Sequence, residues 1–328
     1  MPTIYVSDPI HDEVLAELRG FGDVHLGYGP DAVTYSDVCR SVDAVLLRGE
    51  KFTRAMIEAS PRLRIIARHG VGTDNVDLDA ADKAGVWVTN TPGANSRAVA
   101  EHVFALTLTL ARKVTFAAGL PRSGLWRKGR ADNLTGFELH GRTLGLLGLG
   151  NIGTLVAGLG RAFGMHLLVT DPAAGAATVE AVGGRKVELD ELLAGSDMVS
   201  LHLPLVPATR HIIGAGEFAR MRPGALLINT SRGGLVDETA LVGSLRSGRL
   251  GGAALDVLEA ENTDLLDPLP HNLTPLAEFD NLLVTPHIGG HTEESGRKVA
   301  DTAAACIRQA LSGQVPDNIV PPPDPTAP

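Results

Sequence analysis

The sequence has few cysteines, no dense block of basic residues and no cluster of metal-ligand type. Only Cys39 and Cys306 occur in 328 residues, too few and too far apart for a disulfide framework or a cysteine-based metal site, which suits a reducing cytosol. The formal net charge is -9, and Lys/Arg clusters do not exceed pairs such as Arg127 and Lys128. A nucleic acid or an anionic membrane is therefore not an expected partner. His, Cys, Asp and Glu residues lack metal-ligand spacing, so no metal is expected.

The sequence also lacks the features of export or membrane insertion. The N-terminal segment "MPTIYVSDPIHDE" has no basic region followed by a long apolar region, so it predicts a first strand rather than a signal peptide. The most apolar run, "AVAEHVFALTLTLARK", carries Glu101 and His102 at one end and Arg112 at the other. Its apolar part is too short to span a bilayer and predicts a buried helix. We expect a cytoplasmic protein without membrane contact.

Short β-branched segments alternate with amphipathic segments along the chain, and the length favours about two domains. The first series contains "TIYVS", "DVHLGY", "DAVLLR", "LRIIARHG" and "GVWVTN". A long helix is predicted from Ser96 to Ala118. The second series runs from "TLGLLG" through "HLLVTD", "MVSLHLP", "ALLINTS" and "GGAALDV" to "NLLVTPHIGG". These patterns predict two α/β domains with parallel sheets. A last helix is expected in "EESGRKVADTAAACIRQALSG", followed by the frayed tail "VPPPDPTAP".

A glycine motif opens the second series. Gly148, Gly150 and Gly153 form G-x-G-x-x-G between an apolar strand and a segment of helical pattern. The first glycine permits the tight turn, the second admits a pyrophosphate close to the backbone, and the third lets helix and strand pack closely. The motif in this context predicts a dinucleotide site rather than an ordinary glycine-rich turn.

An acidic residue supports this interpretation. Asp171 ends the next predicted strand, 18 residues after Gly153, near the usual spacing of about 20. A carboxylate there would bind the ribose hydroxyls and repel a 2′-phosphate. Because "DPAAGAAT" contains no Arg or Lys, NAD is favoured over NADP.

Further polar residues follow the later strands, where open α/β sheets build their ligand sites. Arg232 follows "LLINTS", Asp256 and Glu261 follow "GAAL", and His287 follows "LLVTP". A guanidinium can bind a carboxylate in bidentate fashion, and a histidine can exchange a proton with a substrate oxygen. Taken singly, these residues are better explained as a surface arginine, a pair of solvated carboxylates and a histidine in a turn.

Taken together, the motifs resemble the D-isomer-specific 2-hydroxyacid dehydrogenase family, and most closely its phosphoglycerate dehydrogenase branch. The resemblance is carried by "RHGVGTDNVD", "NTPGANSRAVAEH", "GLGNIG", "LHLPL", "INTSRGGLVDE", "GGAALDV" and "TPHIGG", in that order. It implies that Arg232 binds the substrate carboxylate, that His287 is the acid/base and that Glu261 is its carboxylate partner. It also implies that Asp256 holds the nicotinamide amide and that the substrate is a 2-hydroxy or 2-keto acid.

The same motifs imply the remaining positions of the site. Further cofactor-binding positions fall on Asn151, Ile152, His202, Pro204 and Thr230. On the substrate side, backbone N–H groups of Val71 and Gly72 and the side chain of Asn95 are implied to take part.

The resemblance also implies the domain organisation. Residues 1–95 and 291–328 would form a discontinuous substrate-binding domain, and residues 96–290 an NAD-binding Rossmann domain. Both would be Rossmann-like or flavodoxin-like doubly wound parallel sheets, with the catalytic cleft between them. The helix after Asn95 and the arm with Trp126 are expected to form a homodimer. We expect no regulatory domain like that of some phosphoglycerate dehydrogenases after the last helix, and therefore no serine feedback through such a domain.

The substrate itself stays open. Arg48 and Arg68 match arginines of the phosphoglycerate dehydrogenase branch and could bind a second anionic group, as in 3-phosphoglycerate or 3-phosphohydroxypyruvate. Equally, both could be exposed or make structural salt bridges. The segment 262–272 is longer than the usual connection, and His69 and His291 replace smaller residues.

Related activities on the same fold are the alternatives. Formate dehydrogenases carry glutamine as the histidine's partner, where this chain has Glu261, and phosphite dehydrogenases carry a lysine where it has Val71. An NAD-sensing, corepressor-like binding protein is a further alternative of a different class.

Overall fold

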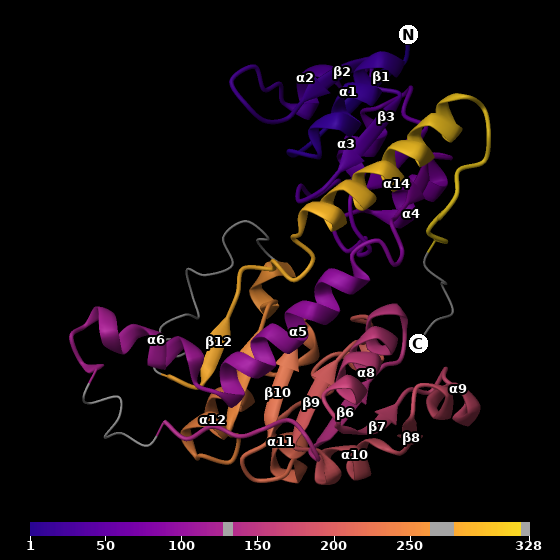
Figure 1. Cartoon of the computed structure of the whole chain (residues 1–328). Coiled ribbons are helices and arrows are strands. Elements are labelled where there is room, and N and C mark those ends of the chain that lie inside the picture. The colour runs from indigo at the N-terminus through magenta and orange to yellow at the C-terminus, as the bar shows by residue number, and fades with distance from the viewer. Residues whose placement is uncertain (127–133, 263–278, 323–328) are drawn as a thin grey trace. The chain divides into compact units, whose positions relative to one another are not determined.

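The computed structural model describes residues 1–126, 134–262 and 279–322. The chain divides into two compact units (Figure 1). Met1–Asn95 with His291–Pro328 form one, here called the terminal unit, and Ser96–Gly290 form the other, here called the central unit. The chain therefore passes between the units twice, after Asn95 and after Gly290.

The terminal unit has a five-stranded parallel sheet in the order β2-β1-β3-β4-β5. This is the flavodoxin-like order of a doubly wound sheet. Its strands are β1 (Thr3–Val6), β2 (Asp23–Leu26), β3 (Ala44–Leu47), β4 (Ile65–Arg68) and β5 (Trp87–Thr89). Its helices are α1 (Asp12–Phe21), α2 (Tyr35–Val38), α3 (Arg54–Glu58), α4 (Leu78–Lys83) and α14 (Glu293–Leu311).

The C-terminal helix α14 completes the core of this unit. It lies against α1, β3 and β4, and its buried stripe is made of small or branched residues: Val299, Ala300, Ala303, Ala304, Ile307 and Ala310. Thr292 caps the helix by accepting a hydrogen bond from the Ser295 N–H at 3.1 Å. The proline-rich tail was expected to be frayed, but its first residue is ordered, because the Val320 N–H donates to the Val88 carbonyl at 2.8 Å. Residues 323–328 of the predicted tail lie outside the described residues.

The central unit has a seven-stranded parallel sheet in the order β12-β11-β10-β9-β6-β7-β8. This is the Rossmann order with one strand added at the edge. Its strands are β6 (Thr143–Leu147), β7 (His166–Thr170), β8 (Gly184–Lys186), β9 (Met198–Leu201), β10 (Leu226–Asn229), β11 (Gly252–Leu255) and β12 (Leu282–Val284). Its helices are α5 (Ser96–Ala111), α6 (Val114–Arg122), α8 (Asn151–Ala162), α9 (Ala176–Ala181), α10 (Leu189–Gly195), α11 (Ala215–Arg220) and α12 (Glu238–Arg246).

Helices cover both faces of this sheet (Figure 1). One apolar cluster joins the sheet to α10, α11 and α12, and a second joins it to α5 and α8. Strands β9, β10 and β11 are buried at every position, as expected of parallel strands between two helical layers. The predicted pair of doubly wound parallel sheets is confirmed.

One predicted helix is interrupted. The helix expected from Ser96 to Ala118 is instead α5 and α6, separated at Lys113, whose φ of +52° is left-handed. The prediction was wrong there because the apolar pattern continues across the break. No single helix in the described ranges is long and apolar enough to cross a membrane. Only Ser96–Ala111 and Val114–Pro121 taken together meet that criterion, and they are bent by 62°.

Two glycines of α8 have different surroundings. A Cβ on Gly153 would lie 2.3 Å from the Gly148 carbonyl oxygen, closer than atoms can approach. A Cβ on Gly158, one and a half turns further along the helix, would meet open space. Close packing therefore requires glycine at position 153 but not at position 158.

This contrast predicts opposite effects of one substitution on stability. Gly153→Ala should lower the free energy of unfolding by about 1–3 kcal/mol, because the turn before α8 must move. Gly158→Ala should raise it by about 1 kcal/mol, because alanine is the better helix former. Thermal unfolding of the two variants measures this. Equal melting temperatures for both variants would show that the turn does not depend on Gly153.

Candidate functional site

The candidate residues of the central unit lie at the carboxyl ends of its parallel strands. The glycine motif follows β6, Asp171 follows β7, His202 follows β9, Arg232 follows β10, and His287 follows β12. The neighbours of β6 in the sheet are β7 and β9, so the direction of winding reverses at β6. Ligands of open α/β sheets bind outside the strand ends at such a switch point.

The glycine loop has the shape of a dinucleotide cradle. Gly148 has a φ of +97°, and its Cβ would lie 2.4 Å from the His202 carbonyl oxygen. A Cβ on Gly150 would meet nothing within 4 Å. Packing within the protein therefore does not explain Gly150, whereas room for a pyrophosphate does. Asn151 begins α8 as an exposed residue, and Ile152 is half-buried behind it.

Asp171 is held against this loop by backbone donors. Its Oδ2 accepts from the Leu149 N–H at 2.7 Å, and its Oδ1 accepts from the Ala173 N–H at 2.8 Å. Lys186 of β8, which no sequence motif indicated, also lies here: its ammonium group donates to the Ala174 carbonyl at 2.6 Å. The pairing of β7 with β8 brings this cation near, and a local motif does not show such pairings.

Two polar atoms near the loop are buried without a hydrogen-bond partner among the described residues. They are His202 Nδ1 and Thr230 Oγ1. Burial lowers the pKa of His202 to about 4, so the ring is neutral at pH 7, and its Nε2 lies 3.0 Å from Ser200 Oγ. Pro204 follows as an exposed residue. Buried polar atoms usually have partners, so the two atoms and the glycine cradle fit a bound dinucleotide.

His287 and Glu261 form a pair. His287 Nδ1 lies 2.7 Å from Glu261 Oε2, and the side chains are 47% and 12% exposed. The second oxygen, Glu261 Oε1, accepts from the Leu258 N–H at 2.8 Å. His287 has a φ of +54°, which is uncommon for a residue with a side chain and is maintained only where the surroundings enforce it. A histidine so held on a carboxylate can exchange protons through its other nitrogen.

Arg232 is placed beside this pair by a tight backbone contact. It precedes the short 3₁₀ helix Gly233–Leu235. A Cβ on Gly233 would lie 2.0 Å from the Leu258 carbonyl carbon, so this turn packs directly on the segment that leads to Glu261. The Arg232 carbonyl accepts from Asn229 Nδ2 at 2.8 Å, and its Nη1 donates to the Ser231 carbonyl at 2.7 Å.

Asp256 follows β11 and is almost completely buried. Oδ1 accepts from Thr285 Oγ1 at 2.5 Å and from the Ile288 N–H at 2.9 Å, and Oδ2 accepts from the Gly289 N–H at 2.7 Å. Burial alone would raise the pKa of this carboxyl, but the hydrogen bonds from these groups and from His102 lower it below its usual value. Asp256 is therefore an anion whose oxygens are engaged within the protein.

An acidic cluster that was not expected from the sequence lies next to Glu261. Glu238 Oε1 accepts from the Glu259 N–H at 2.7 Å. The Glu259 carboxylate contacts His211 Nε2 at 3.0 Å and pairs with Arg210. Burial and the charges of Glu259 and Glu261 raise the pKa of Glu238. Glu238 lies in the quoted motif "INTSRGGLVDE", so an acidic residue at the start of a helix was the available signal.

In the terminal unit, Arg48 and Arg68 differ in their surroundings. Arg48 Nη1 donates to the Pro9 carbonyl at 3.2 Å, and its Nη2 lies 3.2 Å from His291 Nε2. Arg68 donates from Nε to Asn75 Oδ1 at 3.1 Å and from Nη1 to the His69 carbonyl at 2.5 Å. Arg68 therefore shapes its own loop.

The other candidate residues of this unit follow β4 or β5. Burial, followed by the charges of Arg48 and Arg68, lowers the pKa of His69 to about 4, so this ring is neutral. Val71 is exposed, Gly72 is half-buried, and Asn95 Oδ1 is buried without a partner in the described part of the chain. The long segment expected at 262–272 lies outside the described residues except for its first residue.

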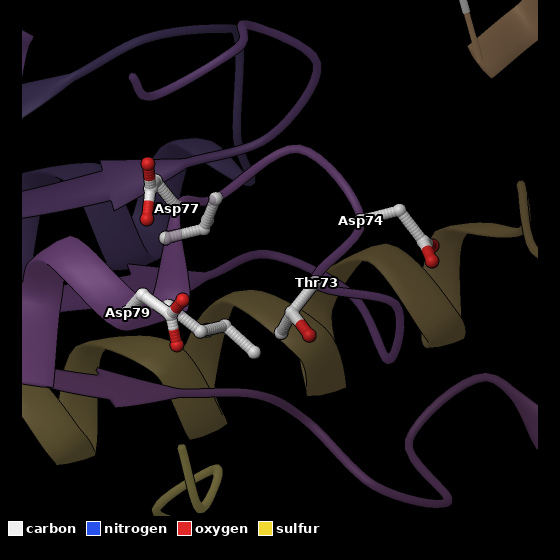
Figure 2. A pocket seen from close by; sticks show the side chains of 6 residues that line it. Thr73, Asp74, Asp77 and Asp79 are labelled. Carbon is white, nitrogen blue, oxygen red and sulfur yellow. The ribbon is translucent and has the colours of Figure 1, made fainter. Parts of the chain in front are cut away.

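A hollow of about 310 Å³ in the terminal unit lies on the segment that directly follows Gly72. Thr73, Asp74, Asp77 and Asp79 line it, and Figure 2 shows Asp74 pointing away from Asp77 and Asp79. In the described ranges, no three His, Cys, Asp or Glu residues are grouped to hold a metal ion. The hollow therefore does not qualify as a cation site.

Comparison with known proteins gives the family. The model of the D-isomer specific 2-hydroxyacid dehydrogenase, NAD binding domain, matches residues 104–289. A D-3-phosphoglycerate dehydrogenase of Methanocaldococcus jannaschii is 38% identical over 322 residues, which cover 98% of this chain and 59% of that protein. A glyoxylate reductase of Thermococcus litoralis is 36% identical over 327 residues, which cover 97% of this chain and 96% of that protein. The chain thus spans 59% of the length of the first relative and nearly all of the second.

Solved structures agree with this assignment. A D-lactate dehydrogenase from Aquifex aeolicus, complexed with NAD and lactic acid, matches with a TM-score of 0.86 and 29% identity, covering 98% of this chain and all of that one. The TT0316 protein from Thermus thermophilus matches with a TM-score of 0.87 and 34% identity over 97% of this chain and all of that one. The resemblance inferred from the motifs is confirmed: the chain belongs to the D-isomer-specific 2-hydroxyacid dehydrogenase family, and its central unit contains that family's NAD-binding domain.

Proposed function

We propose that the protein is an NAD-dependent oxidoreductase that interconverts a D-2-hydroxy acid and the corresponding 2-keto acid. The observation that carries the proposal is the 2.7 Å contact between His287 Nδ1 and Glu261 Oε2. This pair lies at the same edge of the sheet as Arg232 and the glycine loop. A proton donor, a cation and a dinucleotide cradle are the three parts that such a reaction requires.

Each group of the chain has a role in this proposal. With Nδ1 on Glu261, His287 has Nε2 left to give a proton to the keto oxygen. Arg232 binds the substrate carboxylate and polarises the carbonyl. Asp171 binds the adenosine ribose, and His202 and Thr230 contact the cofactor with their buried polar atoms. Bound NADH would supply the hydride to the keto carbon.

Replacement of His287 should lower turnover without weakening cofactor binding. We expect NADH oxidation, followed at 340 nm, with at least one of glyoxylate, pyruvate, hydroxypyruvate, 3-phosphohydroxypyruvate or a bulky aromatic 2-keto acid. His287→Ala should lower kcat by about a hundredfold or more, because the proton donor is lost, and should leave the Kd for NADH nearly unchanged.

Controls make this outcome decisive. His166→Ala, at an exposed histidine on β7, should retain full turnover. NADPH, formate and phosphite complete the panel, the last two in the oxidation direction. Normal turnover in His287→Ala would exclude His287 as the acid. NADH binding without turnover of any substrate would contradict the proposal and favour the corepressor-like function.

We propose further that the substrate side chain carries a second anion, such as a phosphate. Its support is the Arg48 guanidinium, whose neighbour His69 is kept neutral by burial. The first relative described above is named a phosphoglycerate dehydrogenase. The second is named a glyoxylate reductase, and glyoxylate carries no second anionic group.

Replacement of Arg48 tests the second anion. Arg48→Gln should raise KM for 3-phosphohydroxypyruvate about tenfold or more, since a charged hydrogen bond is worth about 1.5–3 kcal/mol, and should leave KM for pyruvate nearly unchanged. Arg40→Gln, at an exposed arginine of the same unit, is the matched control. Equal changes for both substrates, or a wild-type preference for an uncharged side chain, would reject the role.

We also propose a cytoplasmic homodimer. The two cysteines are free, and five large apolar side chains of the α5–α6 region are exposed: Leu108, Val114, Phe116, Leu125 and Trp126. Figure 1 shows α6 at the edge of the central unit. Several large apolar side chains exposed along one segment of the chain are typical of an interface.

Sedimentation equilibrium tests the assembly. The wild type should sediment as a dimer. Phe116→Lys should weaken the dimer by about tenfold or more, because it places a charge in an apolar contact. Phe163→Lys, at an exposed apolar residue that follows α8, should not. A monomeric wild type would contradict the proposal.

A further inference from the structure

A buried polar cluster lies beneath the loop that carries His287. It consists of His102 on α5, Asp256 after β11 and Thr285 after β12. The side chains of His102 and Asp256 are 17% and 2% exposed. His102 Nε2 lies 3.3 Å from Thr285 Oγ1 and 3.4 Å from Asp256 Oδ1. Thr285 Oγ1 lies 2.5 Å from Asp256 Oδ1.

The directions of these hydrogen bonds follow from the chemistry of the groups. An ionised carboxylate only accepts, so the single hydroxyl proton of Thr285 points to Asp256. Thr285 Oγ1 can then only accept from His102, and Nε2 of His102 must carry a proton. His102 therefore orients the hydroxyl group, and the hydroxyl group binds the carboxylate.

The Asp256 residue in turn shapes the loop from Thr285 to Gly289. Its carboxylate accepts from the Ile288 and Gly289 N–H groups at 2.9 and 2.7 Å. Its carbonyl oxygen accepts from the His287 N–H at 2.9 Å. A Cβ on Gly289 would lie 2.8 Å from Asp256 Oδ2. The main-chain N–H groups of His287 and of the two residues after it are thus attached to Asp256, which explains how the left-handed conformation at His287 is maintained.

We propose that His102 is a positioning residue for the reaction, and that it acts through Thr285 and Asp256 to hold His287 against Glu261. This inference rests on the proposed function of His287. It gives Asp256 a role in the loop in addition to the nicotinamide contact that the resemblance implies. His102 itself contacts neither of the two reacting side chains, His287 and Glu261, in any hydrogen bond described above.

Three variants test the proposal by turnover. His102→Leu removes the donor at similar size and should lower kcat about tenfold to a hundredfold, since a misplacement of about 1 Å can cost that much. The Kd for NADH should change less than threefold. His102→Gln keeps an N–H donor and should recover kcat to within about threefold. Thr285→Val removes the hydroxyl group and should resemble His102→Leu.

The double variant separates positioning from a loss of packing. If the two residues act through one chain of hydrogen bonds, His102→Leu with Thr285→Val should lower kcat no further than the worse single variant. Additive losses, or a His102→Leu variant with unchanged kcat and a lowered melting temperature, would overturn the proposal. His166→Leu is the control for the loss of a histidine.

A second measurement does not depend on turnover. In protein labelled with ¹⁵N-histidine, the ring resonances of His287, assigned by comparison with His287→Gln, report its contact with Glu261. They should shift in His102→Leu toward their positions in Glu261→Ala and return in His102→Gln. Unchanged His287 resonances in His102→Leu would overturn the proposal. Shifted resonances in a protein without turnover would support the positioning and reject only the proposed function.

Discussion

The Asp256 carboxylate is the constraint on which the His287 end of the site depends. A buried anion must be surrounded by donors, because an unpaired buried charge is strongly destabilising. The donors here come from the β12 loop and from α5. The chain enters the central unit at Ser96, where α5 begins, and leaves it after Gly290, where the β12 loop ends. One buried charge thus links both segments inside this unit.

A second constraint joins Arg232 to Glu261. Gly233 has no room for a Cβ against the Leu258 carbonyl, so the turns after β10 and β11 stay in contact. Glu238 and Glu261 each accept a hydrogen bond from a backbone N–H group of the turn after β11. These two bonds hold the Glu238 and Glu261 carboxylates close together despite their repulsion. Arg210 and His211 bind Glu259 on the outer side and reduce that repulsion. Arg232 and Glu261 are therefore positioned by neighbours rather than by their own strands alone.

The sequence predicted the parts of the structure that depend on local pattern. Alternating apolar segments predicted both sheets, and the glycine motif with Asp171 predicted the dinucleotide cradle. Both could be predicted because strand period, turn conformation and spacing depend on residues that are close together in the sequence. The break at Lys113 was not predictable, since the apolar pattern continues through it. Lys186, His102 and Glu238 were not identified because strand pairing or packing brings them to the site. Arg68 was an ambiguous residue in the sequence, and its bonds to Asn75 and the His69 carbonyl are visible only in the folded loop.

In the terminal unit, hydrogen bonds likewise indicate which charged group could bind a substrate. Burial lowers the pKa of His69 to about 4, so this histidine adds no charge at pH 7. A guanidinium only donates, so the 3.2 Å contact from Arg48 requires an unprotonated Nε2 on His291. Arg68 directs two of its donors into its own loop. In the proposed function the Arg48 guanidinium, which lies against His291 and the Pro9 carbonyl, is the group assigned to a second anion. A single oriented guanidinium discriminates by about one charged hydrogen bond, roughly 1.5–3 kcal/mol, which is enough to rank substrates without excluding smaller keto acids.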